Sequence, residues 1–227
     1  SLKVEEDVPI GAKMLSSTIE SAQAKVEGRN FAIRKNVLQF DDVANRQREV
    51  IYKQRQQVLD GVDISAVISK MVDDTVGETV DRFIGTSDDY HDWNLHGLRD
   101  FFLGWAITKD EMVYATDEEK AQVQPEKLKD FLRERLHMLY TKREAMFGPQ
   151  LMRELERVIL LKNVDAKWMD HIDAMEDLKK GIYLRSYAQR DPVIEFRMES
   201  GEMFNQMVDL IWEDTIKMLL TVQVRVT

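Results

Sequence analysis

The sequence contains no cysteine, which excludes a disulfide framework, a thiolate nucleophile and a thiolate metal site. Ten glycines and four prolines among 227 residues are few, so little of the chain is predicted to form turns. No apolar run approaches the length that crosses a bilayer, and the first residues lack the apolar core of a signal peptide. These absences favour a helical protein in a reducing, cytosolic setting, and the start at Ser1 is typical of a fragment of a longer protein.

Motifs for catalysis are missing too. The sequence contains neither G-x-x-x-x-G-K-[ST] nor G-x-G-x-x-G, the glycine-rich loops that hold phosphates. His91 and His96 lie near aspartates, but a separation of five residues is not the spacing of a ligand pair on a helix. His171 lies beside Asp170 and Asp173 without a nucleophile, so we interpret it as a structural histidine. We predict no catalytic residue, no metal site and no cofactor in this chain.

The formal net charge of −9 argues against a nucleic-acid-binding protein, because phosphate contacts need a concentrated basic surface. The charge is unevenly distributed. Residues 86–126 contain ten acidic and three basic side chains, whereas residues 179–197 contain five basic and two acidic side chains. The basic stretch indicates either a docking surface for acidic loops or anionic lipid headgroups, or a solvated turn between two charged helices.

Residues 151–220 carry apolar side chains at steps of three and four, the spacing of one helix face. They predict two long amphipathic helices, the second beginning at Asp191-Pro192, because proline is tolerated in a first turn. Trp168 and the methionines of the second helix lie at core spacing, and we interpret them as structural. Two antiparallel helices joined by a short basic loop form a finger, whose tip is the main functional candidate.

A second apolar stripe runs through the N-terminal part of the chain. Its members are Val26, Ile33, Val37, Phe40, Ala44, Ile51 and Val58. After an extended lead-in, Ser16 or Ser17 is expected to cap the helix, with Glu20 completing a capping box, and Asp60-Gly61 is expected to end it. A helix of about 43 residues would be roughly 65 Å long, which is typical of a strut that packs against several partners.

Residues 64–84 and 127–147 predict two more amphipathic helices, separated by an aromatic cluster between Trp93 and Ile107. Glycines 61 and 148 bound this region. We therefore expect an all-α protein in three parts: a very long scaffold helix in residues 1–60, an inserted small helical wing domain in residues 61–149, and an antiparallel two-helix finger in residues 150–227 that packs with the long helix.

Two sets of residues carry a resemblance to a known family. In the long helix they are Val26–Phe31, Ile33–Lys35, Phe40–Val43, Gln47-Arg48 and Ile51-Tyr52, and in the finger they are Trp168–His171, Ala174-Met175, Gly181-Ile182, Leu184-Arg185 and Tyr187–Pro192. These flanks, about residues 13–61 and 151–224, resemble the scaffold helix and two-helix finger of the SecA family, the motor subunits of bacterial preprotein translocation. The middle region is similar to the wing domain of that family in position and length.

The resemblance implies a non-catalytic part of an ATP-driven motor. ATP and Mg²⁺ would bind in nucleotide-binding lobes that this chain lacks, and the zinc-binding tail of the family is also absent. The long helix would pack against the missing motor domains through its polar face. The residues expected on that face are Arg29, Asn30, Arg34, Asp41, Asp42 and Arg48.

The same resemblance implies that the finger tip contacts the SecYEG channel and the unfolded preprotein. The expected tip residues are Arg185, Ser186, Tyr187, Gln189 and Arg190. A tyrosine suits such a contact, because its apolar ring and its hydroxyl can grip a polypeptide without reading its sequence. The arginines would meet acidic channel loops or lipid phosphates, which implies a cytoplasmic protein, peripheral on the cytoplasmic face of the bacterial plasma membrane.

Two other functions stay open from the residues alone. A stand-alone helical adaptor would bind partners through the long helix and the finger, and it would form a monomer or a defined dimer. A motor fragment would instead expose faces that its lobes cover, so self-association is expected. An enzyme that uses the acidic aromatic middle region is a weaker third alternative.

Overall fold

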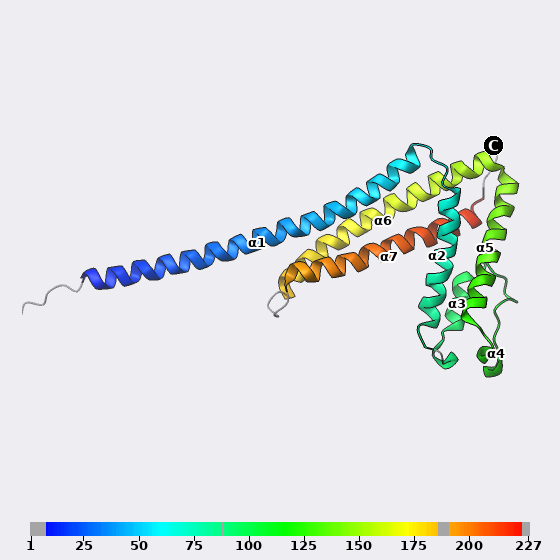
Figure 1. Cartoon of the computed structure of the whole chain (residues 1–227), viewed down its shortest axis with the longest axis horizontal. Coiled ribbons are helices and arrows are strands. Elements are labelled where there is room, and N and C mark those ends of the chain that lie inside the picture. The colour runs from blue at the N-terminus through cyan, green and yellow to red at the C-terminus, as the bar shows by residue number, and fades with distance from the viewer. Residues whose placement is uncertain (1–7, 88, 186–190, 224–227) are drawn as a thin grey trace, which may run out of the picture. The chain divides into compact units, whose positions relative to one another are not determined.

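The computed structural model describes residues 8–87, 89–185 and 191–223, with side chains from Ser16 onward except those of Tyr183 and Arg185. The regular secondary structure in these ranges is helical, apart from an isolated bridge between Leu103 and Ile107, which confirms the predicted all-α class. The elements in chain order are α1 (Val8–Leu59), α2 (Ser65–Ile84), the short 3-10 helix η1 (Tyr90–Asp92), α3 (Leu95–Phe102), α4 (Asp117–Ala121), α5 (Pro125–Phe147), α6 (Pro149–Arg185) and α7 (Pro192–Thr221) (Figure 1).

Proline marks the start of each of the last three helices, α5, α6 and α7. Helices α5, α6 and α7 begin at Pro125, Pro149 and Pro192. Proline suits a first turn, since the N–H that it lacks would have no partner within the helix. Before α7, the Asp191 carboxylate accepts a hydrogen bond from the Val193 N–H at 2.8 Å. The predicted start of the second finger helix is confirmed.

Helix α1 is longer than predicted. It begins at Val8, so the expectation of an extended lead-in and a cap at Ser16 or Ser17 is wrong. Pro9 lies in the first turn, where it does not break the helix. Within the helix, the Ser16 hydroxyl donates to the Glu20 carboxylate at 3.4 Å. This pair is separated by four residues, so it is a contact within the helix and not the Ser17–Glu20 capping box that the sequence suggested.

The chain divides into two compact units, which are described separately. The hairpin unit contains the described residues up to Arg48 together with Met175–Ser200, and the core unit contains Glu49–Ala174 with the described residues from Gly201 onward. Helices α1, α6 and α7 contribute residues to both units. The predicted domains are consecutive ranges of the sequence with limits near Gly61 and residue 149, so they do not correspond to these two units. The predicted limits remain a prediction.

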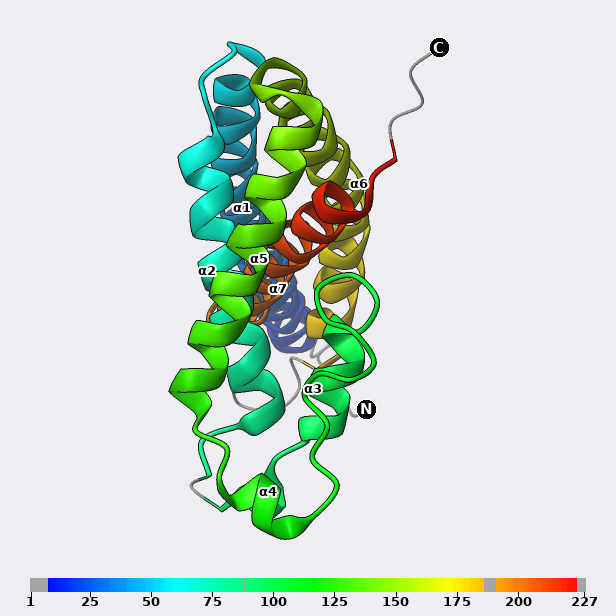
Figure 2. The ribbon, with the colours of Figure 1, turned by 90° about the vertical axis from the view of Figure 1, so that its right-hand side faces the viewer.

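In the core unit, α2 and α5 lie side by side, with α3 against α2 (Figure 2). Fully buried side chains from these three helices include Ile68, Val76, Leu98, Phe102, Leu132 and Leu136. The buried positions of α2 lie three or four residues apart, which confirms the predicted amphipathic helix, although Val67, four residues before the buried Met71, is 47% exposed.

The predicted aromatic cluster is also present in the core unit. The ring centroids of Phe102 and Trp105 lie 5.3 Å apart, those of Phe101 and Trp105 5.9 Å, and those of Phe83 and Phe101 6.3 Å. These separations suit tilted and edge-on aromatic contacts, which add to the stability that ring burial provides.

Two glycines in the left-handed region end the helices at the edges of the predicted wing domain. Gly61 has φ 81° and Gly148 has φ 82°. The Gly148 N–H donates to the Glu144 carbonyl at 2.8 Å, which closes the last turn of α5. A side chain would strain either conformation, because a Cβ atom disfavours positive φ. Gly61 and Gly148, which were predicted from the sequence to end helices, therefore do so because they adopt a backbone conformation that other residues disfavour.

Candidate functional site: the long helix and the helical hairpin

The hairpin unit has a small apolar core of its own. The end of α6 and the start of α7 pack against α1, and the buried side chains are Phe40, Met175, Ile182, Val193 and Phe196. The rings of Phe40 and Phe196 are both fully buried, and their centroids lie 4.4 Å apart. These contacts seat the two finger helices on the predicted apolar stripe of α1.

Polar contacts surround this core. Lys179 lies 2.9 Å from Asp41 on α1 and 3.1 Å from Glu176 on its own helix. Burial lowers the pKa of Lys179, but hydrogen bonds to Asp41 and Glu176 outweigh burial and raise that pKa above its usual value. The Gln47 side chain also donates to the Ser200 carbonyl at 3.1 Å. The hairpin is thus fixed along α1 from Phe40 to Gln47.

On the N-terminal side of this contact, the described part of α1 packs against no other element of the chain. Every side chain from Ser16 to Lys35 is exposed. Among the described side chains, the large apolar residues that are exposed in the hairpin-unit part of α1 are Ile19, Val26, Phe31, Ile33, Val37 and Leu38. We call these six residues the bare apolar set.

The bare apolar set occupies two sides of the helix. Ile19, Val26, Ile33 and Val37 follow the stripe that contains Phe40, whereas Phe31 and Leu38 lie on the opposite side by the 3.6-residue period. Phe31 is 71% exposed and Leu38 is 66% exposed. A helix with apolar residues on both sides is typical of one that is buried on both sides. The prediction from sequence named one stripe and missed Phe31 and Leu38, although their spacing of seven was visible.

The six residues expected on the polar face of α1 fall into two groups, exposed residues and one half-buried residue. The exposed members are Arg29, Asn30, Arg34, Asp42 and Arg48. Arg48 donates to Asn45 at 3.1 Å, and Asp41 is half-buried in its ion pair with Lys179. Five of the six residues therefore remain available to another molecule, while Asp41 also holds the hairpin.

The expected finger tip falls largely outside the described residues. Ser186, Tyr187, Gln189 and Arg190 are not described, nor is the side chain of Arg185. In the residues that flank this segment in the sequence, the side chains of Leu184, Ile194 and Met198 are 80%, 57% and 64% exposed.

Two of the basic residues near this loop are engaged. Lys179 pairs with Asp41, and Lys180 lies 2.9 Å from Asp177 on its own helix. These ion pairs leave the exposed Leu184, Ile194 and Met198 next to the basic residues in the sequence. The charge pattern alone did not indicate this apolar component.

The histidines do not form a site in the described part of the chain. His91 lies 2.6 Å from Asp89 and His96 lies 3.0 Å from Asp100, so they face different carboxylates. His171 is buried between the rings of Trp168 and Phe204, and burial lowers its pKa, which agrees with a structural role. No set of three or more potential metal ligands occurs among the described residues. None of the described helices combines the length and the apolar character of a membrane span.

Comparison with known proteins places these features in a family context. Residues 9–223 match the family described as the SecA wing and scaffold domain. The chain is 43% identical over 223 residues to the protein translocase subunit SecA of Syntrophomonas wolfei, covering 98% of this chain and 26% of that protein. It is 46% identical over 224 residues to the protein of the same name from Caldicellulosiruptor saccharolyticus, covering 97% of this chain and 25% of that protein. The chain spans about a quarter of the length of the curated relatives it matches.

Proposed function

Since the chain belongs to the SecA wing and scaffold family, we propose that it is a non-catalytic helical scaffold on which other parts of a protein translocase pack. The observation that carries this proposal is the bare apolar set on two sides of α1. Large apolar side chains exposed along a helix mark a surface that binds another protein surface. The packing partners are the motor domains of a longer translocase, where ATP and Mg²⁺ bind.

The polar residues of α1 add specificity to this surface. Arg29, Asn30, Arg34, Asp42 and Arg48 are exposed, and charges at the rim of an interface orient a partner more than they tighten its binding. Asp41 contributes by holding Lys179 and hence the hairpin. This division of roles follows from the burial of each side chain.

The hairpin is the part that we propose to act on SecYEG and on the translocating polypeptide. Tyr187 would touch the polypeptide, and Arg185, Ser186, Gln189 and Arg190 would meet channel loops or lipid phosphates at the cytoplasmic face of the membrane. The exposed Leu184, Ile194 and Met198 support an apolar docking surface next to that tip. The identity of the relatives as translocase subunits supports the assignment of the partner.

A transport assay tests the tip. In the full-length translocase that contains this chain, Tyr187→Ala should abolish most preprotein transport into channel-containing vesicles, while channel binding and basal ATP hydrolysis persist. Met146→Ala is the control, since Met146 is 62% exposed on α5, outside both α1 and the hairpin, and should leave transport unchanged. Unchanged transport in the Tyr187→Ala variant would show that contact between the tip and the polypeptide is not needed for transport.

A stand-alone adaptor is the second candidate, and the same exposed faces of α1 favour it. Sedimentation of the isolated chain separates the two functions. A scaffold should self-associate through the bare apolar set, and Phe31→Ser with Leu38→Ser should suppress the association. A monomer or a defined dimer that is insensitive to these substitutions would favour the adaptor.

A further inference from the structure

A small polar hollow lies between α2 and α7 in the core unit, and we call it the acidic hollow. It has a volume of about 180 Å³, and its lining residues are Thr75, Glu78, Thr79 and Arg82 on α2 with Asp209 and Glu213 on α7. Successive lining positions on each helix are no more than four residues apart, so one face of each helix lines the hollow. Pockets for drug-sized ligands have volumes of about 300–1,000 Å³, so this hollow suits a single small group.

Contacts between the two helices hold the acidic hollow open in a fixed shape. The Arg82 guanidinium lies 3.5 Å from the Glu213 carboxylate, and the Lys70 ammonium lies 5.5 Å from the centroid of the Trp212 ring. Both contacts join α2 to α7 without a ligand. A site that is already formed requires little ordering when a ligand binds.

Glu78 on α2 and Asp209 on α7 face each other across the acidic hollow. Burial, the charge of Asp209 and a hydrogen bond between the two carboxyl groups raise the pKa of Glu78 to about 7. Neither residue forms an ion pair with a basic side chain in the described ranges. Two carboxylates this close repel each other unless a proton or another cation lies between them. A cation in the hollow would therefore take the place of that proton.

Thr75 provides an independent sign that the hollow takes a ligand. The residue is 4% exposed, and its hydroxyl oxygen is buried without a hydrogen-bond partner among the described residues. A threonine inside a helix often bonds to a carbonyl of the preceding turn, which Thr75 does not do. A buried polar group that lacks a partner is costly to keep. Because Thr75 lines the acidic hollow, a donor placed there would supply the missing partner.

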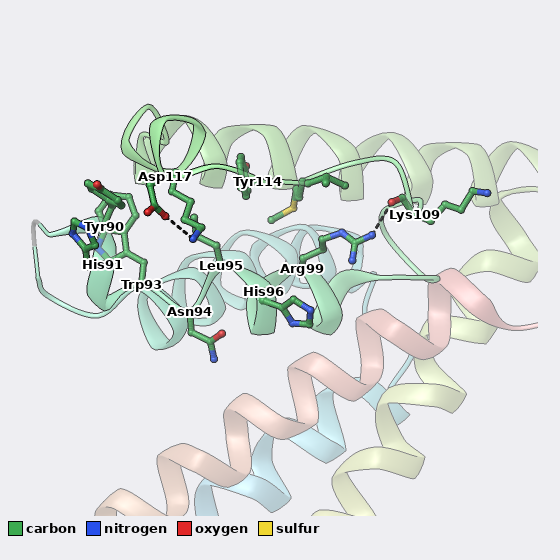
Figure 3. A pocket seen from close by; sticks show the side chains of 13 residues that line it. Tyr90, His91, Trp93, Asn94, Leu95, His96, Arg99, Lys109, Tyr114 and Asp117 are labelled. Atoms are coloured by element: carbon green, nitrogen blue, oxygen red, sulfur yellow. Dashed lines mark hydrogen bonds and ion pairs between the residues drawn. The ribbon is translucent and has the colours of Figure 1, made fainter.

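A larger hollow of about 610 Å³, beside α3, differs in this respect (Figure 3). Its charged side chains have partners within the fold. Asp117 lies 2.9 Å from Lys120, and Arg99 donates to the Lys109 carbonyl at 2.7 Å. A charged ligand in this hollow would compete with contacts that already exist.

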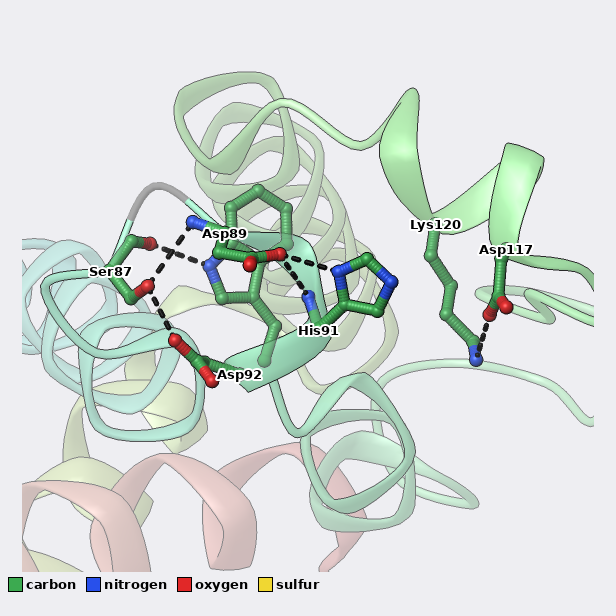
Figure 4. A network of polar contacts seen from close by, with 7 residues as sticks. Ser87, Asp89, His91, Asp92, Asp117 and Lys120 are labelled. Atoms are coloured by element: carbon green, nitrogen blue, oxygen red, sulfur yellow. Dashed lines mark hydrogen bonds and ion pairs between the residues drawn. The ribbon is translucent and has the colours of Figure 1, made fainter.

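The polar groups at the edge of the larger hollow also pair with one another. The Ser87 hydroxyl donates to Asp92 at 2.7 Å, and Asp89 accepts from the His91 N–H at 3.0 Å (Figure 4). These bonds satisfy the groups without a ligand. The acidic hollow is therefore the better candidate, although it is the smaller of the two.

The chemistry of the acidic hollow favours one kind of cation. A metal ion is disfavoured, since no three potential metal ligands lie together in the described part of the chain. A guanidinium is a broad planar fork, whereas the two carboxyl groups here are close enough to share a hydrogen bond. A primary ammonium is compact and has three N–H donors. Three acceptors match them: the carboxylates of Glu78 and Asp209 and the hydroxyl of Thr75.

From this arrangement we propose that the acidic hollow binds a primary ammonium group, which donates to Glu78, Asp209 and Thr75. The ammonium is the end of a free alkylamine or of a lysine side chain, and the two share this chemistry. The site uses no residue of the bare apolar set or of the expected finger tip. It therefore does not rest on the function proposed above.

A titration followed by nuclear magnetic resonance tests the proposal on the whole chain. The first probe is butylamine, and its control is butyltrimethylammonium, which keeps the charge and the alkyl chain but has no N–H donor. The amide signals of residues 75–82 and 209–213 report binding. We expect butylamine to bind about tenfold more tightly than its control, because only butylamine donates hydrogen bonds.

A second pair of probes distinguishes the two sources of the ammonium. It consists of lysine with both ends capped and the same compound with a trimethylated side-chain nitrogen. Selective binding of butylamine supports the proposal and shows that a free amine suffices. Selective binding of the capped lysine alone supports it and assigns the site to a lysine of a protein. Failure of both pairs to show selectivity overturns the proposal.

Substitutions locate the site. Glu78→Gln removes a charge, and Thr75→Val removes the hydroxyl while keeping the shape of the side chain. We expect each to weaken binding of the selective probe about tenfold. Glu154→Gln is the matched control, since Glu154 lies on α6, is 56% exposed and does not line the acidic hollow. An equal loss in the control would indicate general attraction to an acidic protein and overturn the proposal.

Competition with a proton gives a further readout. The charged groups that face Glu78 are Asp74 and Arg82 on α2 and Asp209 and Glu213 on α7. The affinity for the selective probe should rise by up to about tenfold per pH unit from about pH 5 to about pH 7 and level off above about pH 8, because the ammonium displaces the shared proton. The probe itself stays charged over this range. An affinity that does not change with pH overturns the proposal.

Discussion

The Arg153 guanidinium lies 2.9 Å from the carboxylate of Glu156, which is fully buried. Tyr140 on α5 donates its hydroxyl hydrogen to the same carboxylate. Arg153 also lies 2.7 Å from Glu144 on α5 and 3.6 Å from Asp63 in the loop after α1. One arginine therefore joins α6 to the residues beside both Gly61 and Gly148, the two glycines that bound the predicted wing domain.

Removing Arg153 should destabilise the core unit. Arg153→Met leaves Glu156 buried without its cation, at a cost of about 3 kcal/mol in the free energy of unfolding. Burial already raises the pKa of Glu156, against the opposing effects of Tyr140 and Arg153. Urea unfolding measures the change. The double variant Arg153→Met with Glu156→Leu should recover much of the loss, and a double variant as unstable as the single one would contradict this account.

Phe40 and Phe31 offer a matched pair on one helix. Phe40→Ala empties a fully buried site against Phe196 and should cost about 3–5 kcal/mol of hairpin stability. Phe31→Ala removes a ring that is 71% exposed and should change stability by less than about 0.5 kcal/mol. Hydrogen exchange of the amides in Met175–Ile182 reports local opening of the hairpin. Similar exchange in both variants would show that the Phe40 contact does not hold the hairpin.

Glycine-to-alanine changes should have opposite signs at two positions. Gly148 has φ 82°, so alanine there forces a strained backbone and should destabilise by about 1 kcal/mol. Gly201 lies inside α7, and nothing would lie within 4 Å of an added Cβ, so alanine should stabilise by about 1 kcal/mol. Thermal unfolding of both variants checks the pair. A loss of stability at Gly201 would indicate a close neighbour that the structure does not contain.

The carboxyl group of Glu78 should make the stability of the core unit depend on pH in the acidic range. Burial, with the nearby Asp209 carboxylate, raises the pKa of Glu78 to about 7. A carboxyl whose pKa is higher in the folded state binds its proton more tightly there, so stability should fall as pH rises from about 4.5 to about 7. Glu78→Gln keeps the shape and removes the titration. Its melting temperature should vary less than that of the unchanged chain over this window, and parallel profiles would exclude Glu78 as the cause.

The sequence determined the helices by itself, because periodicity and local stop signals act over a few residues. Apolar steps of three and four located α2, α6 and α7, and Gly61, Gly148 and Pro192 placed three boundaries. The start of α1 was missed because a capping signal at Ser16 or Ser17 also fits a helix interior. The resemblance of the flanks to one family was likewise readable from residues alone, and the match to residues 9–223 confirms it.

Only the tertiary structure decided which side chains are covered. Asp41 pairs with Lys179 on another helix, and Glu156, besides its pair with Arg153 on its own helix, accepts a hydrogen bond from Tyr140 on another helix. No local pattern specifies the contacts between helices. Helix formation follows from contacts between residues close in sequence, whereas burial, ion pairing and pockets follow from contacts between residues far apart, and those exist only once the chain has folded.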